Sequence, residues 1–170
     1  MGIISFFKEA GEKLFGSKEQ AAVQQAQATP SSAELQAKAA EANRVAGDAI
    51  LAYIKTQSLS ADGLSIDFDG ASGSVDVSGV APDQATKEKI VLCCGNVHGV
   101  SQVNDLMTVA QPADESQWHT VAKGDTLSAI AKKFYGNAND YPTIFEANKP
   151  MLKHPDKIYP GQLLRIPKKG

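Results

Sequence analysis

The fold of this chain is decided by three blocks near its C-terminus: His119-Thr-Val-Ala-Lys-Gly-Asp-Thr-Leu-Ser-Ala-Ile-Ala131, Ile144-Phe-Glu-Ala-Asn148 and Lys157-Ile-Tyr-Pro-Gly-Gln-Leu-Leu-Arg-Ile-Pro167. The first block predicts a strand that ends at Val121 and then a helix capped by Asp125, with Gly136 just past the helix end. The second block predicts a helix after Asp140, and the third ends in a strand that pairs with the first. Together they predict a βααβ unit over residues 118–170.

In order and spacing, these blocks resemble the LysM domain. The resemblance implies a module that binds and does not catalyse, with a shallow groove for peptidoglycan or chitin glycans that contain N-acetylglucosamine. It places that groove between two loops, formed by Gly124, Asp125, Thr126 and Leu127 and by Ile158, Tyr159, Pro160 and Gly161. The same residues also have a purely structural interpretation, because Asp125 is a helix cap and Tyr-Pro-Gly is a turn.

Residues upstream predict a second unit of mixed structure. Ser31 and Glu34 form a capping box ahead of a long helix. Apolar and polar residues alternate over 64–68 and 74–78, which predicts two strands joined by a glycine-containing hairpin turn. The acidic residues of this turn, followed by Gly70, also allow a second interpretation as a calcium-binding loop, although the closing Glu of such a loop is missing.

A helix that begins at Pro82 and a strand over 100–109 complete the order αββαβ. This order, with Gly79-Val-Ala-Pro before the helix and Gly95-Asn-Val-His-Gly99 after it, resembles the BON domain. We therefore expect an α+β chain of two small domains, BON and LysM. The expected boundaries are 31–110 for BON and 118–170 for LysM, with a polar hinge over 111–117.

The N-terminal thirty residues are expected to be an appendage of the BON domain. Residues 1–15 place Ile3, Phe7 and Leu14 at helical spacing, which predicts an amphipathic helix. This helix either packs on its own domain or lies on a membrane surface, and its mixed charges favour packing. Residues 16–30, rich in Gln, Ala and Ser, are predicted to be a mobile connector.

Composition excludes several functional classes. The 170 residues are 42% hydrophobic and 21% charged, and the net charge of −2 gives no basic footprint for nucleic acid. No run approaches the roughly 20 apolar residues of a membrane span. The start lacks the features of a secretory leader, and the adjacent Cys93 and Cys94 suit a reducing interior, so we expect a cytoplasmic monomer. The dispersed His98, His119 and His154 fit no catalytic motif, so we expect no enzyme activity.

The whole chain, from Met1-Gly-Ile-Ile-Ser-Phe-Phe-Lys-Glu-Ala-Gly-Glu-Lys-Leu14 through both domains, resembles the bacterial cytoplasmic potassium-binding proteins that join BON to LysM. The resemblance implies a K⁺ sensor or buffer in which LysM docks on BON when the ion is present. It assigns the ion to backbone carbonyl groups of Phe7, Ala10, Glu12, Gly95 and Val97. Carbonyl oxygens can replace the water shell of K⁺, and Gly95 and Gly99 allow the chain to turn them inward. The alternative is that Gly95 only ends a helix and the N-terminal segment only covers the core.

Overall fold

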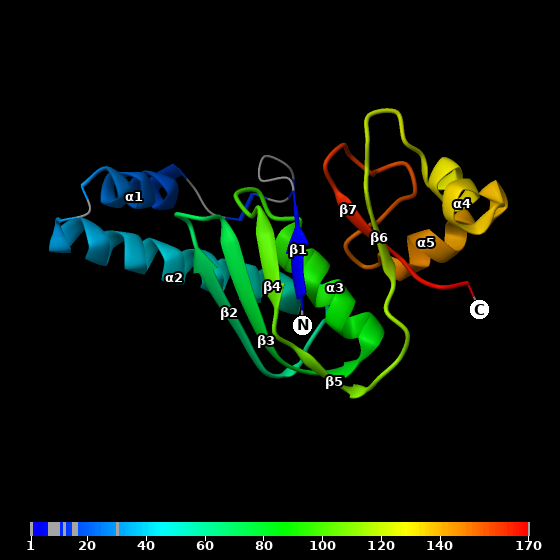
Figure 1. Cartoon of the computed structure of the whole chain (residues 1–170), viewed down its shortest axis with the longest axis horizontal. Coiled ribbons are helices and arrows are strands. Elements are labelled where there is room, and N and C mark those ends of the chain that lie inside the picture. The colour runs from blue at the N-terminus through cyan, green and yellow to red at the C-terminus, as the bar shows by residue number, and fades with distance from the viewer. Residues whose placement is uncertain (1, 7–10, 12, 15–16, 30, 170) are drawn as a thin grey trace.

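The computed structural model of the chain describes residues 2–6, 11, 13–14, 17–29 and 31–169. It contains a sheet domain (residues 2–111), in which helices cover one face of a sheet, and a smaller C-terminal domain (residues 117–169) (Figure 1). Helix α1 (Ser17–Ala28) and the first half of α2 (Ala33–Thr56) extend at the end of the molecule opposite the C-terminal domain. The predicted α+β class with two small domains is confirmed.

The sheet domain contains five strands: β1 (Gly2–Ser5), β2 (Asp62–Asp69), β3 (Ser74–Asp83), β4 (Gln102–Asp105) and β5 (Thr108–Gln111). The strand order is β1-β4-β3-β2, and β5 pairs with the later part of β3. Strand β3 is antiparallel to β2 and parallel to β4, because helix α3 (Gln84–Gly95) connects β3 to β4 as a crossover. The turn after α3 therefore leads directly into the strand that pairs with β1.

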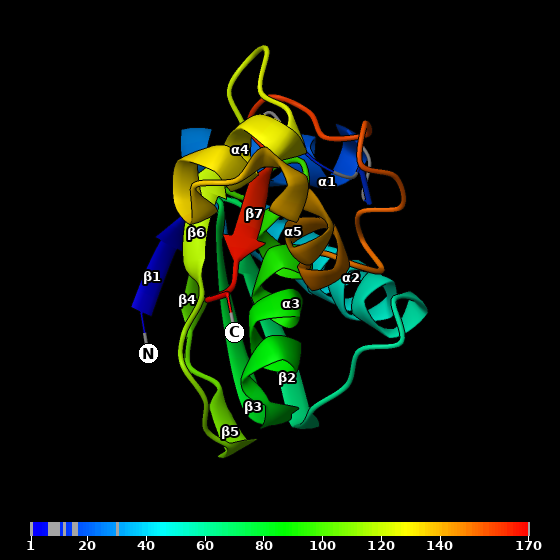
Figure 2. The same ribbon diagram turned by 90° about the vertical axis from the view of Figure 1, so that its right-hand side faces the viewer.

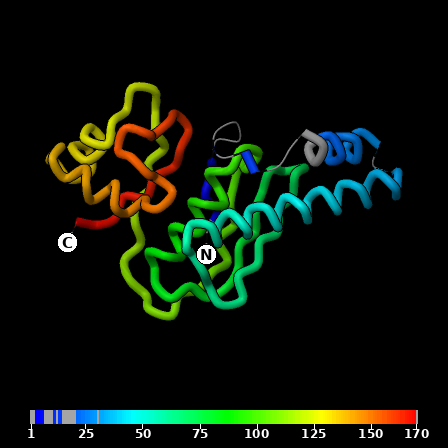
Figure 3. Tube along the Cα trace, turned by 180° about the vertical axis from the view of Figure 1, so that it is seen from behind, coloured from blue at the N-terminus to red at the C-terminus, as the bar shows by residue number. Residues whose placement is uncertain are grey.

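The hydrophobic core of the sheet domain lies between the sheet and helices α2 and α3. Val75, Val77 and Val103 contribute from the strands, and Ile50 and Ile90 meet them from the helices; all are fully buried. Burying one such side chain contributes about 1.5–3 kcal/mol. In the view from behind, α2 runs across the face of the sheet (Figure 3). The helices thus cover one sheet face and leave the other to solvent.

The predicted amphipathic helix over residues 1–15 is wrong at its start, because Gly2–Ser5 form the edge strand β1. The side chain of Ile3 is 69% exposed whereas Ile4 packs against the core, which is the alternation of a strand. Pairing with β4 provides hydrogen-bond partners for the backbone groups of both strands, whereas a helix over residues 2–5 would leave this edge of β4 unpaired. Tertiary pairing therefore outweighs the helical spacing of the apolar residues.

The predicted mobile connector over residues 16–30 is also wrong, because most of it forms α1. This helix packs along α2, where Val23 and Ala26 contact Ala39 and Ala42 in a small apolar cluster. Gln and Ala are common in linkers, but both are good helix formers. An adjacent helix is enough to select the helical state.

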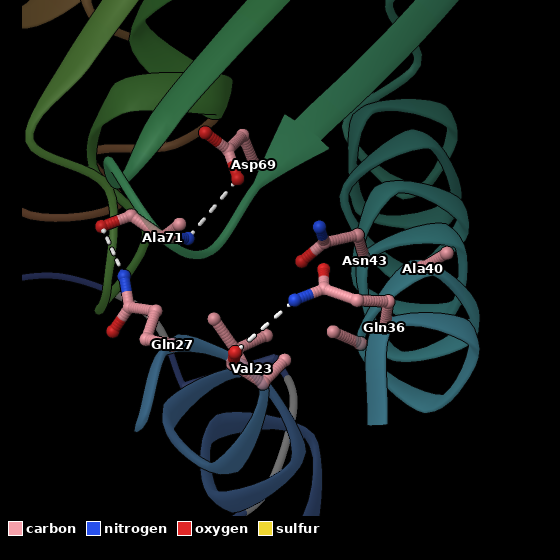
Figure 4. A pocket seen from close by; sticks show the side chains of 9 residues that line it. Val23, Gln27, Gln36, Ala40, Asn43, Asp69 and Ala71 are labelled. Atoms are coloured by element: carbon pink, nitrogen blue, oxygen red, sulfur yellow. Dashed lines mark hydrogen bonds between the residues drawn. The ribbon is translucent and has the colours of Figure 1, made fainter. Parts of the chain in front are cut away.

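Polar side chains tie α1 to its neighbours around a groove of about 270 Å³ (Figure 4). The amide of Gln36 in α2 donates to the carbonyl oxygen of Ala26 at 3.1 Å, and Gln27 in α1 donates to the carbonyl oxygen of Ala71 at 3.1 Å. The second bond reaches the turn between β2 and β3. That turn is the predicted hairpin.

Three predicted boundaries in the sheet domain shift. Ser32, not Ser31, caps α2, because its hydroxyl accepts from the backbone N–H three residues later at 3.2 Å. Pro82 lies in β3 and does not begin α3; Asp83 caps that helix through a 2.7 Å bond to a backbone N–H. The strand predicted over 100–109 is divided into β4 and β5.

The C-terminal domain has the predicted βααβ order. Strands β6 (Gln117–Thr120) and β7 (Leu163–Ile166) pair antiparallel. Helices α4 (Leu127–Tyr135) and α5 (Tyr141–Ala147) follow β6, joined by the 3-10 turn η1 (Ala138–Asp140). Residues from both helices and from β7, together with Val121 just after β6, share one buried cluster.

The ends of α4 test two predictions. Gly136 has φ 79° at the end of the helix, so the predicted left-handed cap is confirmed. The N-cap is Thr126 and not Asp125, because the Thr126 hydroxyl accepts from the backbone N–H of Ala129 at 3.1 Å. Asp125 instead accepts from the backbone N–H of Ala122, one turn earlier in the chain.

Candidate functional site

The turn after α3 contains the two predicted carbonyl ligands that the structure describes. Gly95 is the last residue of α3, and the backbone N–H of Asn96 bonds back to the helix at 2.9 Å. Val97 is fully buried, and its carbonyl oxygen accepts from the N–H of Val100 at 3.1 Å. Gly99 then adopts φ 103°, a left-handed conformation that favours glycine. Gly95 and Val97 are therefore brought together in one buried turn.

Phe6 covers this turn from the N-terminal side. Its backbone N–H donates to the carbonyl oxygen of Ser101 at 2.8 Å, which continues the pairing of β1 with β4. Its ring lies so close to Gly95 that a Cβ there would be 1.9 Å from Cζ of the ring. Only glycine leaves room for this approach.

Gly11 makes a second backbone contact with the same turn. It has φ 107°, and a Cβ built on it would lie 2.3 Å from the carbonyl oxygen of Asn96 and 2.9 Å from the nitrogen of Val97. The main chain at Gly11 therefore packs directly on the peptide group that joins Asn96 to Val97. This peptide lies between the predicted ligands Gly95 and Val97.

The remaining predicted ligands, Phe7, Ala10 and Glu12, lie outside the described residues. Their described neighbours Phe6 and Gly11 both contact the turn after α3. The assignment of Phe7, Ala10 and Glu12 as ligands stays a prediction.

The chemistry at this turn is that of main-chain oxygens. Among the described residues, no group of three or more His, Cys, Asp or Glu side chains is arranged to hold a metal ion. A carbonyl oxygen has two lone pairs, so the Val97 oxygen can accept from Val100 and still face a cation. In general, a ring of neutral carbonyl oxygens suits a large, weakly hydrated cation, whereas divalent cations take carboxylates.

Asn96 connects the turn to the C-terminal domain, a link that sequence reasoning missed. Its carboxamide donates to the carbonyl oxygen of Leu163 at 2.8 Å and accepts from the N–H of the same residue at 3.0 Å. The side chain thus pairs with β7 as a neighbouring strand would. Figure 2 shows β7 beside α3. An Asn after a helix is an ordinary end signal, so nothing in the sequence revealed its distant partner.

A second link between the domains is a buried ion pair that the sequence analysis also missed. The guanidinium of Arg165 in β7 lies 2.8 Å from Oε2 of Glu88 in α3, and both side chains are less than a tenth exposed. Arg165 also donates to the carbonyl oxygen of Ala147 and to the hydroxyl of Ser116, each at 3.1 Å. We call these four residues the interdomain latch. Its one sequence signal is an arginine within the otherwise apolar β7.

The polar hinge predicted over residues 111–117 is held in place at its end. Ser116 is buried, and its backbone N–H donates to Oε1 of Glu88 at 2.8 Å. The same oxygen accepts from the amide of Gln84 at 3.0 Å. Because the linker end is bonded into the latch, it is part of the domain contact in this structure.

Opposing effects act on the pKa of Glu88. Burial raises the pKa, whereas hydrogen bonds from Ser116 and Gln84 and the charge of Arg165 lower it. The net result is a pKa below the usual value of a glutamate, so the carboxylate is ionised at neutral pH. A buried charge with this many partners is favourable only while all of them stay in place.

The two loops predicted to form a glycan groove lie side by side in the C-terminal domain. The backbone N–H of Gly161 donates to the carbonyl oxygen of Val121 at 2.8 Å, which joins the second loop to the end of β6. On the first loop, Gly124 has φ 89° and Leu127 is almost wholly buried. Leu127 and Ile158 belong to the same apolar cluster.

Asp125, a predicted glycan contact, already has protein partners. Its Oδ2 lies 2.9 Å from the backbone nitrogen of Ala122 and 2.9 Å from Nε2 of His119. The hydrogen bond from the backbone of Ala122 lowers the pKa of Asp125 most, and the hydrogen bond with the His119 side chain lowers it further. In the second loop, the N–H of Tyr159 bonds to the side chain of Gln162 at 3.2 Å.

Cys93 and Cys94 are both buried in α3. Burial raises the pKa of Cys93 to about 12 and raises that of Cys94 well above its usual value. Both thiols therefore stay protonated at neutral pH, which makes them poor nucleophiles and poor redox sensors. Their role in this structure is packing.

Comparisons with known proteins match both domains. The BON domain family matches residues 48–111, and the LysM domain family matches residues 119–167. Within the part of the chain that the structure describes, no helix could cross a membrane.

One relative aligns over almost the whole chain. The "Potassium binding protein Kbp" of Escherichia coli O6:H1 is 45% identical over 167 residues, which cover 98% of this chain and 99% of that protein. An "Uncharacterized protein" of Deinococcus radiodurans is 34% identical over 110 residues, 63% of this chain and 34% of that protein. An "Endolysin" of Bacillus phage B103 is 35% identical over 80 residues, 47% of this chain and 27% of that protein. With its paired domains and this full-length similarity, the chain belongs to the BON plus LysM family that includes the potassium binding protein Kbp.

Proposed function

We propose that this protein selectively binds K⁺ and serves as a cytoplasmic sensor or buffer of the ion, as a monomer without catalytic activity. The ion is held by backbone carbonyl groups of Phe7, Ala10, Glu12, Gly95 and Val97. The observation that carries the proposal is the packing of the Gly11 main chain on the peptide between Asn96 and Val97. The similarity to a protein named for potassium binding supports it.

The physical basis is the match between oxygen type and ion. Backbone carbonyls carry partial charges, so they offset the dehydration of K⁺ more readily than that of the more strongly hydrated Na⁺, and they cannot replace the carboxylates that Ca²⁺ and Mg²⁺ take. The close approach at Gly11 allows two main-chain segments to meet without a side chain between them, whereas at Gly95 the missing Cβ makes room for the Phe6 ring. That is the arrangement a cage of carbonyl oxygens requires.

Thermal unfolding in matched salts tests the proposal. A ligand that binds only the folded state stabilises it by about 2.7 kcal/mol at 100 times its Kd, which raises Tm by roughly 5–10 °C for a chain of this size. We expect this rise in KCl, and a much smaller rise in NaCl of equal ionic strength. Equal shifts in the two salts would remove K⁺ selectivity from the proposal.

A pair of glycine variants locates the site. Gly11→Ala puts a Cβ where the carbonyl oxygen of Asn96 now lies, so it should push the N-terminal segment off the turn and remove the K⁺-specific part of the Tm rise. Gly63→Ala is the control, since Gly63 also has a positive φ, 64°, but a Cβ there meets no atom within 4 Å. The control should keep the K⁺ response. Loss of the response in both variants would show that general destabilisation is the cause.

Glycan binding by the C-terminal domain is the second candidate. It is favoured by the shared apolar cluster of Leu127 and Ile158, one residue from each predicted loop, and by the match to the LysM family. Calorimetric titration of the full chain with chito-oligosaccharides should give heat that is lost in Tyr159→Ala. Absence of heat at millimolar sugar would leave this domain as a packing partner of the sheet domain.

A further inference from the structure

A cleft of about 460 Å³ lies between the two domains. Tyr53 of α2 and Leu92 of α3 line it from the sheet domain, and the loop over residues 151–162 lines it from the C-terminal domain. We infer that this cleft is a binding site for a small anionic ligand that joins a phosphate group to a flat ring, the chemistry of a nucleoside monophosphate. The inference goes beyond the proposed ion binding and does not depend on it.

The charge at the rim of the cleft selects an anion. Lys153, Lys157 and His154 line one side of it, all three are exposed, and no carboxylate lines it. Within the described residues, neither lysine has an ion-pair partner. In a chain whose net charge is −2, this local excess of positive charge draws anions to one place.

His154 adds a directed hydrogen-bond donor. Its Nδ1 accepts the backbone N–H of Asp156 at 3.1 Å, so the neutral ring carries its proton on Nε2 and can donate to an anion. The carboxylate of Asp156 is 90% exposed and lies 3.8 Å from Nδ1, outside the lining of the cleft. The donor therefore remains available in either charge state of the ring.

The floor of the cleft is apolar. Leu92 and Leu152 line it but are each only 2% exposed, so its accessible apolar surface comes from the partly buried Tyr53 and Met151, which pack against the core of the sheet domain. An inorganic anion alone would leave this surface in water, whereas a ligand with a flat ring would cover it. Small-molecule sites are typically clefts of 300–1,000 Å³ with an apolar floor and a few polar groups, so the size and lining fit a mononucleotide.

Because each domain supplies one wall, a ligand in the cleft contacts both. Asn96, which pairs with β7, also lines the cleft. Ligand binding should therefore stabilise the docked arrangement of the domains. The expected observation is a rise in Tm on addition of the ligand to the K⁺-loaded protein.

The test is calorimetric titration of the full chain in KCl with AMP, adenosine and inorganic phosphate. AMP should bind at least tenfold more tightly than either of the other two, since only AMP uses both the rim and the floor. No heat and no rise in Tm with millimolar AMP would overturn the inference. An affinity for phosphate equal to that for AMP would also overturn it, because the apolar floor would then contribute nothing. An affinity for adenosine equal to that for AMP would overturn it too, because the lysines would then contribute nothing.

Charge reversal locates the site. The double variant Lys153→Glu/Lys157→Glu should weaken AMP at least tenfold while leaving the K⁺-dependent rise in Tm unchanged. Lys123→Glu/Lys132→Glu is the matched control, because both lysines are exposed in the same domain but do not line the cleft. An equal loss of AMP affinity in both variants would overturn the assignment to the cleft. In the wild-type chain, AMP binding without any K⁺-specific rise in Tm would count against the ion proposal alone.

Discussion

At the scale of single residues, the candidate ion site depends on two glycines, because glycine has no Cβ. Gly95 and Gly11 let the Phe6 ring and the N-terminal main chain approach the turn after α3. The oxygen donors that we propose belong to the backbone, so the side chains around them can vary without changing the donor set. What must be kept is the absence of a Cβ.

We expect Gly95→Ala to act by displacing Phe6. The new Cβ would lie 1.9 Å from the ring, which must swing out and lose burial worth about 1.5–3 kcal/mol. Alanine returns up to about 1 kcal/mol of helix propensity, so the net loss of unfolding free energy should be about 1–2 kcal/mol. Denaturant unfolding of the two single variants and the double variant with Phe6→Ala measures the coupling. In the Phe6→Ala background, Gly95→Ala should be neutral or stabilising; an undiminished cost would mean that some other contact is responsible.

At the scale of elements, the helices differ in how much core they hold. Helices α2 and α3 bury isoleucines against the sheet, whereas α1 buries mainly Val23 and Ala26 against other alanines. Small side chains bury little apolar area, and isolated helices of about this length are marginal in water. Helix α1 is therefore expected to open independently of the core.

Val23→Ser tests this independence. It should accelerate amide hydrogen exchange throughout α1 while changing the free energy of global unfolding by less than about 1 kcal/mol, because the core does not rely on α1. Gln24→Ser is the control, as it removes a good helix former from an exposed position of the same helix and should change exchange much less. A global loss of 2 kcal/mol or more would place α1 in the cooperative core.

At the scale of the whole molecule, the two domains are joined by polar contacts and by Leu163 of β7, which is buried in the core cluster of the sheet domain. The interdomain latch and the pairing of Asn96 with Leu163 bury charged and amide groups that lose their hydrogen-bond partners when the domains separate. Such groups regain water on separation, so they set the geometry of docking more than its strength. Docking should accordingly respond to pH.

We expect Glu88→Gln to cost roughly 3 kcal/mol of stability near neutral pH, because it leaves the buried charge of Arg165 without its partner. The pKa of Glu88 is lowered in the folded protein, so its contribution is fully present above the unfolded value of about 4.3 and is lost as pH falls through the folded value. Unfolding measured between pH 7 and pH 3 should therefore show a shallower acid loss in the variant. Asp114→Asn, which removes an exposed ion pair to Lys168, should cost less than about 1 kcal/mol. Identical acid profiles for Glu88→Gln and the wild type would contradict the assigned role.

The sequence-based predictions failed where a distant strand or helix chose between two locally acceptable structures. The apolar spacing of residues 1–15 fits a helix, but pairing with the edge of β4 selected a strand over residues 2–5. Residues 17–28 fit a linker or a helix, and α2 selected the helix. The cap at Thr126 moved by one residue because His119 and Ala122 bind Asp125 instead.

By itself, the sequence determined the βααβ and αββαβ orders, the two-domain organisation and the turn of Gly95 and Val97, because periodicity, turns and glycine placement are local properties of the chain. The tertiary structure alone decided that Asn96 pairs with β7, that Glu88 meets Arg165, and that a cationic cleft forms between the domains. These contacts join residues far apart in the chain. They follow from how two finished domains meet, a long-range choice that no local pattern contains.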